Sequence, residues 1–216
     1  MITTISTPPQ NSSEEKVITL TGIKWSTFKA IMSDVGDGRA WRIAYDTGVL
    51  EIRMPLTEHE EPKGMIESFV EALADKLEIE VRKLGALTLE REDLTRAIEP
   101  DTCFYIQNES IVRGKSINLP ADPPPDLVVE SDYTNSSLNK FAIYAALGVP
   151  EIWRYRNQSL LVYQLVDGNY EERENSVALP FLPIAEIPGL IEQSKSIGQR
   201  AAVRLFRERL KEILPQ

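Results

Sequence analysis

A strand, a helix and a second strand follow one another in the middle of the chain, and this succession limits the possible folds. The short apolar run Leu127–Glu130 is typical of a buried strand. Leu138–Leu147 predicts a helix that Ser137 caps and Gly148 ends. Glu151–Arg156 then predicts the next strand. This alternation is typical of a sheet flanked by helices.

The remaining patterns extend this alternation over most of the 216 residues. Period-two runs predict further strands at Ala40–Tyr45, Val49–Met54, Gly85–Glu90, Thr102–Gln107, Leu160–Leu165 and Tyr170–Arg173. Apolar stripes predict helices at Trp25–Met32 and Lys63–Leu77, around Glu186–Gln193, and at Ile197–Leu214. Residues 1–16 are polar and predict a flexible arm, which leaves 17–216 as a single domain. We therefore expect an α/β (α+β) fold with a central mixed sheet and flanking helices.

Cysteine and histidine are almost absent, and this restricts the metals that the chain can bind. Cys103 is the single cysteine, so no internal disulfide can form and a cytoplasmic location is expected. His59 is the single histidine, which excludes zinc sites built from several Cys or His ligands within one chain. A metal would be held by carboxylates and carbonyls, which favours magnesium, manganese or calcium.

Charge and hydropathy give two further expectations. No apolar run approaches the roughly 20 residues of a membrane-spanning helix, so we expect no membrane partner. The chain has 24 Lys and Arg against 33 Asp and Glu, a net charge of −9. Taken alone, this balance argues against nucleic acid as a partner, because phosphate binding depends on Lys and Arg.

The sequence contains none of the common glycine-rich or nucleophile motifs. It has no G-x-x-x-x-G-K-[ST], G-x-G-x-x-G or G-x-S-x-G, so phosphate-loop, dinucleotide-binding and serine-hydrolase functions have no support. A nucleophilic pair of Cys103 and His59 is formally possible. The simpler interpretation is that Cys103, inside an apolar strand, is a small buried side chain.

Carboxylates at the ends of two predicted strands are the best candidates for chemistry. Asp101 precedes one strand, and Glu130 ends the apolar run that begins after Asp126. If the two strands are neighbours, Asp101 and Glu130 can converge on a cation, with Lys140 nearby on the next helix. A separation above about 8 Å would exclude a shared ion, because hard cations lie about 2 to 2.6 Å from their ligands. The alternative is that the acids are ordinary turn or cap residues and Lys140 faces solvent.

Four segments together resemble a known nuclease family. They are MPLTEHE (54–60), EPDTCFYIQNES (99–110), DPPPDLVVESD (122–132) and SSLNKFAIYAALGVPEIWRY (136–155). They are similar to the restriction-endonuclease-like family often called Uma-two, abundant in cyanobacteria and part of the PD-(D/E)xK nuclease superfamily. The resemblance extends from about Arg39 to about Tyr170.

The resemblance implies a set of catalytic residues. In the superfamily pattern an Asp, often after Pro, is followed on the next strand by (Asp/Glu)-x-Lys. Asp101 and Glu130 match the two acids, which implies that they hold Mg²⁺ or Mn²⁺. Asp132 stands where the pattern has lysine, and Lys140 on the following helix is the residue that can replace it.

The superfamily also tends to place a glutamate on the first core helix. Glu60, Glu67 and Glu71 are the candidates, and the sequence does not choose among them. His59 matches the EHE element of the family, and Asp132 is a possible extra ligand.

The function implied is metal-dependent hydrolysis of DNA phosphodiester bonds by an endonuclease. The alternative is a catalytically weak or inactive module of the same fold with a binding or regulatory role, which the acidic balance and the displaced lysine favour. A third option is a phosphoesterase that acts on nucleotides. Superfamily members often dimerise, so a homodimer is possible, through the strand pair at 151–165 or the C-terminal helix.

Overall fold

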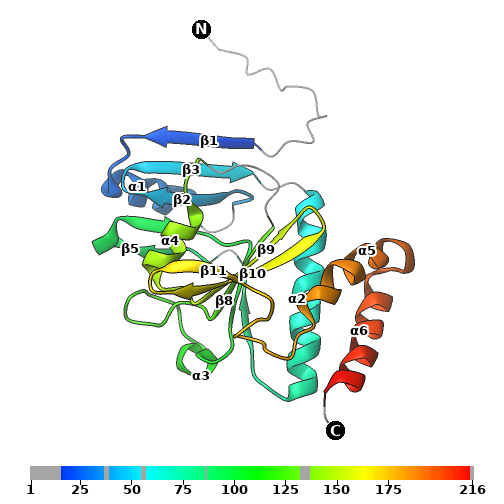
Figure 1. Ribbon diagram of the computed structural model, residues 1–216. Coiled ribbons are helices and arrows are strands. Elements are labelled where there is room, and N and C mark those ends of the chain that lie inside the picture. Colours follow the sequence, from blue (N-terminus) through cyan, green and yellow to red (C-terminus); the bar gives the residue numbers. More distant parts are fainter. Residues whose placement is uncertain (1–15, 37–38, 55–56, 86, 132–136, 215–216) are drawn as a thin grey trace, which may run out of the picture.

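The computed structural model describes residues 16–36, 39–54, 57–85, 87–131 and 137–214, except the side chains of residues 57–59. Within these residues the strands form two sheets that lie against each other (Figure 1). None of the helices in the described residues is both long and apolar enough to cross a membrane.

The first sheet is wholly antiparallel and comes mainly from the N-terminal half of the chain. Its strands, in spatial order, are β1 (Lys16–Thr21), β3 (Val49–Met54), β2 (Arg42–Asp46), β6 (Arg96–Ile98) and β5 (Leu89–Arg91). Helix α1 (Trp25–Val35) covers it by stacking Phe28 on Tyr45, with ring centroids 4.8 Å apart. The 3-10 helix η1 (Glu92–Leu94) connects β5 to β6.

The second sheet is mixed and contains the strand–helix–strand unit. Its strands, in spatial order, are β11 (Asn169–Arg173), β10 (Ser159–Val166), β9 (Glu151–Arg156), β8 (Leu127–Ser131), β7 (Thr102–Tyr105) and β4 (Arg82–Leu84). Only the β8–β9 pair is parallel among the described strand pairs, and α4 (Lys140–Leu147) makes the crossover between them.

The two faces of the second sheet are covered by different layers. On one face lie α2 (Thr57–Leu77), α5 (Ile187–Ile197) and α6 (Gln199–Ile213), which group together in Figure 1. Phe69 and Phe206 join α2 to α6, with ring centroids 4.8 Å apart. On the other face one hydrophobic cluster unites the first sheet, the second sheet and α4, through residues that include Ala44, Val128 and Tyr144. Two small helices, α3 (Glu109–Val112) and η2 (Ile184–Glu186), complete the described structure.

The expected fold class is confirmed, although the strands divide into two sheets where one central sheet was predicted. The predicted strand Gly85–Glu90 is wrong, because β4 ends before it and β5 begins only near its end. Strands β1, β4 and β6 were not predicted. Lys16, assigned to the flexible arm, is the first residue of β1, and residues 1–15 lie outside the described part of the chain.

Three helix boundaries differ from the prediction. Helix α2 begins at Thr57 and continues through Pro62, although a proline inside a helix removes a backbone hydrogen bond. Helix α4 begins at Lys140, and its cap is Asn139, whose side chain accepts a hydrogen bond from the Ala142 N–H at 3.2 Å. The long C-terminal helix begins after Gly198, whose φ of 90° ends α5.

Candidate active site

Asp101 lies where the chain leaves the first sheet and enters the second. It follows β6 and directly precedes β7, which pairs antiparallel with β8, so the two strands that carry the acids are neighbours. The start of β7 therefore lies beside the end of β8, and Asp101 Oδ2 accepts a hydrogen bond from the Ser131 N–H at 2.7 Å. Both residues are buried, so this bond fixes the position of one oxygen of the Asp101 carboxylate.

Glu130 is bound by two side chains from α4. Lys140 Nζ donates to Glu130 Oε2 at 2.8 Å, and the Tyr144 hydroxyl donates to Oε1. Lys140 and Tyr144 are four residues apart and share one face of the helix. Burial, followed by the charge of Glu130, raises the pKa of Tyr144 well above its ordinary value of 10.0, so the phenol stays protonated.

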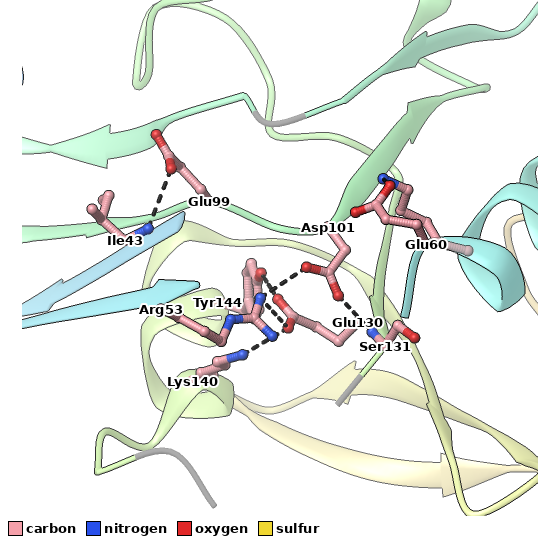
Figure 2. Close-up of polar contacts among 10 residues, drawn as sticks. Ile43, Arg53, Glu60, Glu99, Asp101, Glu130, Ser131, Lys140 and Tyr144 are labelled. Carbon is pink, nitrogen blue, oxygen red and sulfur yellow. Dashed lines mark hydrogen bonds and ion pairs between the residues drawn. The ribbon is translucent and has the colours of Figure 1, made fainter. Parts of the chain in front are cut away.

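Arg53 joins the two acids from the opposite sheet. Its Nη2 lies 2.8 Å from Asp101 Oδ1 and 3.7 Å from Glu130 Oε2. Figure 2 shows this guanidinium pointing at the two carboxylates, with Lys140 and Tyr144 beside Glu130. Because the same nitrogen contacts Asp101 Oδ1 and Glu130 Oε2, these two oxygens are no farther apart than the sum of the two distances. They therefore lie within the limit of about 8 Å set for a shared ion.

Two more buried glutamates belong to the first sheet or directly follow one of its strands. Glu51, two residues before Arg53 on β3, accepts hydrogen bonds from the Ser137 N–H at 2.8 Å and the Ser137 hydroxyl at 2.6 Å. Glu99 accepts from the Thr88 hydroxyl at 2.6 Å, from the Ile43 N–H at 3.2 Å, and from Arg39. Burial raises the pKa of Glu99 above its ordinary value of 4.5.

The structure brings together Asp101, Glu130 and Lys140, whereas Glu67 and Glu71 have another partner. Glu67 and Glu71 both bind Lys83, at 3.2 Å and 2.6 Å. These two contacts direct both carboxylates toward β4, so they give no support to a role at the acid pair.

His59 and Glu60, predicted to lie in the loop before the helix, belong to α2. Glu60 is half exposed and pairs with Lys63 near the start of α2. The His59 side chain and Asp132 lie outside the described residues. Cys103 is fully buried, and burial raises the pKa of its thiol to about 12, which supports the interpretation of a buried side chain over a nucleophile.

Arg53 and Tyr144 were missed by the sequence reasoning, although each left a signal. Arg53 and Glu51 are charged residues two positions apart in an otherwise apolar strand, so they share a face that must meet polar partners. Tyr144 lies one turn after Lys140 on a helix whose neighbouring residues are apolar.

The donor chemistry at this site suits a hard divalent cation. Two carboxylate oxygens already approach one cationic nitrogen, and oxygen ligands are those that Mg²⁺ and Mn²⁺ prefer. Among the described residues no group of three or more His, Cys, Asp or Glu is placed to hold a metal. Two carboxylates are nevertheless enough for Mg²⁺, which usually keeps several waters and binds substrate phosphates as well.

This fold, with buried acids at the junction of β7 and β8, defines a restriction-endonuclease-like protein. A family model described as "Uma2: Putative restriction endonuclease" matches residues 25–193, and the chain therefore belongs to this family. The resemblance found in the sequence is thus confirmed.

A solved structure shares the fold. It is described as a "putative nuclease belonging to DUF820" from Anabaena variabilis, and it aligns with a TM-score of 0.51 and 13% identity over 85% of this chain and 99% of that chain. At this identity the likeness concerns the fold alone. None of the curated proteins matches this sequence.

Proposed function

We propose that the protein is a metal-dependent endonuclease that hydrolyses DNA phosphodiester bonds, with Asp101 and Glu130 as the ligands of Mg²⁺ or Mn²⁺. One observation carries the proposal. Two buried carboxylates from neighbouring strands approach the same cationic nitrogen, while Lys140 binds one of them. The family, described as putative restriction endonucleases, supports DNA as the substrate.

The surrounding residues hold this pair in a fixed orientation. The Ser131 N–H orients Asp101, and Tyr144 orients Glu130 by donating its hydroxyl proton. Lys140 keeps an ammonium group beside Glu130, where it can orient a water molecule and stabilise negative charge on a phosphate. A bound divalent ion would supply Lewis-acid polarisation of the phosphate oxygens.

A second function is favoured by the charge balance of the site. Among the described residues, Arg53 and Lys140 place two positive charges beside the two negative charges of Asp101 and Glu130, so this pair is compensated without a metal. This arrangement supports a nuclease-fold module that binds its target and does not cleave it.

A nicking assay distinguishes the two functions. Supercoiled plasmid is incubated with wild type, Asp101→Asn, Glu130→Gln and Lys140→Met, in Mg²⁺, in Mn²⁺ and in EDTA. We expect metal-dependent nicking by wild type and a loss of more than about 100-fold in each variant, since even a contact behind the metal ligands costs about 10- to 100-fold. Glu67→Gln is the matched control, because Glu67 binds Lys83. Thermal melting checks that every variant folds.

The other outcomes have clear meanings. Equal nicking by wild type and the three variants would show that the site is wrong. Binding of duplex DNA without nicking would select the binding module. Hydrolysis of mononucleotides without nicking of DNA would select a nucleotide phosphoesterase.

A further inference from the structure

Arg53 is held rigidly in the place where the two acids approach each other. Its side chain is only 5% exposed, and it projects from β3 of the first sheet across to the second sheet. Figure 2 shows its guanidinium pointing at Asp101 and Glu130 together. A surface arginine that met these acids by chance would keep its charged end in water.

The guanidinium has an electrostatic reason to be there. Two buried carboxylates close together are costly unless cations or strong donors compensate their charge. Lys140 contacts Glu130, whereas Arg53 contacts Asp101 at 2.8 Å and reaches toward Glu130. Arg53 therefore does in the free protein what a divalent ion would do when bound.

A divalent ion and the guanidinium compete for the same carboxylate oxygens. Asp101 Oδ1 is the atom that Arg53 binds, and it belongs to one of the two proposed metal ligands. Two cations at this spacing repel each other, and the repulsion is strong because the site is buried. The repulsion should therefore loosen the contact between Arg53 and Asp101 when the metal binds.

We propose that Arg53 is a built-in competitor of the metal, which compensates the charge of Asp101 and Glu130 and keeps cations out until a divalent ion displaces its guanidinium from Asp101. The inference rests on the proposed function, since it assumes that Asp101 and Glu130 bind the ion. It assigns to Arg53 the control of metal affinity, so the site is loaded only when the free ion is abundant.

Metal affinity measured without DNA tests the proposal. Binding of Mn²⁺ alone is followed by electron paramagnetic resonance for wild type, Arg53→Gln, Arg53→Lys and Asp101→Asn. We expect Arg53→Gln to bind Mn²⁺ about 10- to 100-fold more tightly, the factor expected for loss of one competing hydrogen bond to a charged group. Arg53→Lys keeps the charge and should stay close to wild type, and Asp101→Asn should lose the site.

Arg96→Gln is the matched control. Arg96 lies on the same sheet and pairs with Asp46 at 2.8 Å, away from the acid pair. Its removal should leave the Mn²⁺ affinity unchanged. A second reading comes from melting temperatures, because Mn²⁺ should stabilise Arg53→Gln more than wild type at equal concentration.

The failures can be told apart. If wild type binds Mn²⁺ through Asp101 and Arg53→Gln binds it equally or more weakly, Arg53 is only a structural tie and the inference is overturned, while the metal site stands. If neither protein binds Mn²⁺ in an Asp101-dependent way, both the inference and the proposed metal site are overturned.

Wild-type protein supplies a measurement that does not depend on a folded Arg53→Gln variant. Arginine side-chain ¹⁵N signals are followed during a Mg²⁺ titration, with Arg53→Lys assigning the Arg53 signal. We expect this signal to shift with the saturation of the site. An Arg53 signal that stays unchanged while the metal binds would overturn the proposal.

Discussion

Individual acids inside this protein are defined by the donors that surround them. Asp101 receives a backbone N–H and a guanidinium, and Glu130 receives an ammonium and a phenol. Glu99 is another buried acid, and burial raises its pKa more than its hydrogen bonds and the charge of Arg39 lower it. The protonation of Glu99 should therefore change the free energy of unfolding with pH.

Replacing Glu99 by Gln should change the pH dependence of stability. Because the pKa of Glu99 is raised in the folded state, the folded protein binds this proton more tightly than the unfolded chain does. The resulting stabilisation is complete below the ordinary value of 4.5 and is lost as the pH rises through the raised value. Denaturant unfolding of wild type and Glu99→Gln between pH 4 and 8 measures this. The stability of wild type relative to the variant should fall with rising pH, and parallel curves would contradict the expectation.

At the residue scale, sequence patterns predicted the two acids that the structure brings together and missed the arginine that contacts both. Asp101 and Glu130 stand at strand ends within recognisable segments, and Lys140 begins the helix that follows. Arg53 belongs to a strand of the other sheet, and nothing local shows which sheet β3 will face. Its proximity to Asp101 depends on tertiary packing, which a pattern within one segment does not contain.

At the element scale, β9 holds the segment that leads into the C-terminal helices. Glu151, at its first position, is 1% exposed and has four donors. The Trp153 indole N–H and the Ser176 hydroxyl donate at 2.5 Å, the Val177 N–H at 2.6 Å and the Ala178 N–H at 3.1 Å. One buried carboxylate thus ties residues 176–178 to the second sheet.

Glu151→Gln should destabilise the protein by about 1 to 3 kcal/mol. The amide replaces one accepting oxygen by an NH₂ group that faces other donors, so buried N–H groups lose their partner. Denaturant unfolding followed by the fluorescence of Trp153 and the other tryptophans measures the change. The control is Glu171→Gln, because Glu171 is an exposed strand residue that pairs with exposed Arg173. We expect the control to stay within about 0.5 kcal/mol of wild type, and an equal loss in both variants would show that the four donors are unimportant.

Long elements were predictable, and short ones were not. Helix α2 and strands β8 to β10 have patterns of sufficient length, and their cores were placed correctly. Strands β4 and β6 have three residues each, too few for alternation to be distinct from a loop. β1 is largely exposed on both faces, so it has no alternating apolar pattern to detect.

At the scale of the whole molecule, the net charge of −9 opposes DNA binding, although we propose that the site binds DNA. Phosphate binding scales with the number of Lys and Arg contacts, and this protein has 24 such residues against 33 acids. A divalent ion would add positive charge at the point where the DNA must approach.

DNA affinity should therefore depend on a divalent ion. In EDTA and 150 mM salt we expect a Kd for a short duplex weaker than about 10⁻⁴ M, the weak end of non-specific binding. Adding Ca²⁺ should tighten binding by wild type and leave Asp101→Asn unchanged. Fluorescence anisotropy of labelled DNA measures both. Tight binding in EDTA would contradict this picture and favour a surface that binds DNA independently of the acid pair.

The position of Asp101 at the crossing between the two sheets also has a consequence for synthesis of the chain. Its partner Arg53 lies 48 residues before it, and Ser131 lies 30 residues after it. Contacts at such separations form only after long loops have closed. A ribosome releases Arg53 and Asp101 well before Lys140 and Tyr144. A nascent chain therefore contains the acids before the contacts that orient them have formed. The complete site exists only once both sheets have docked.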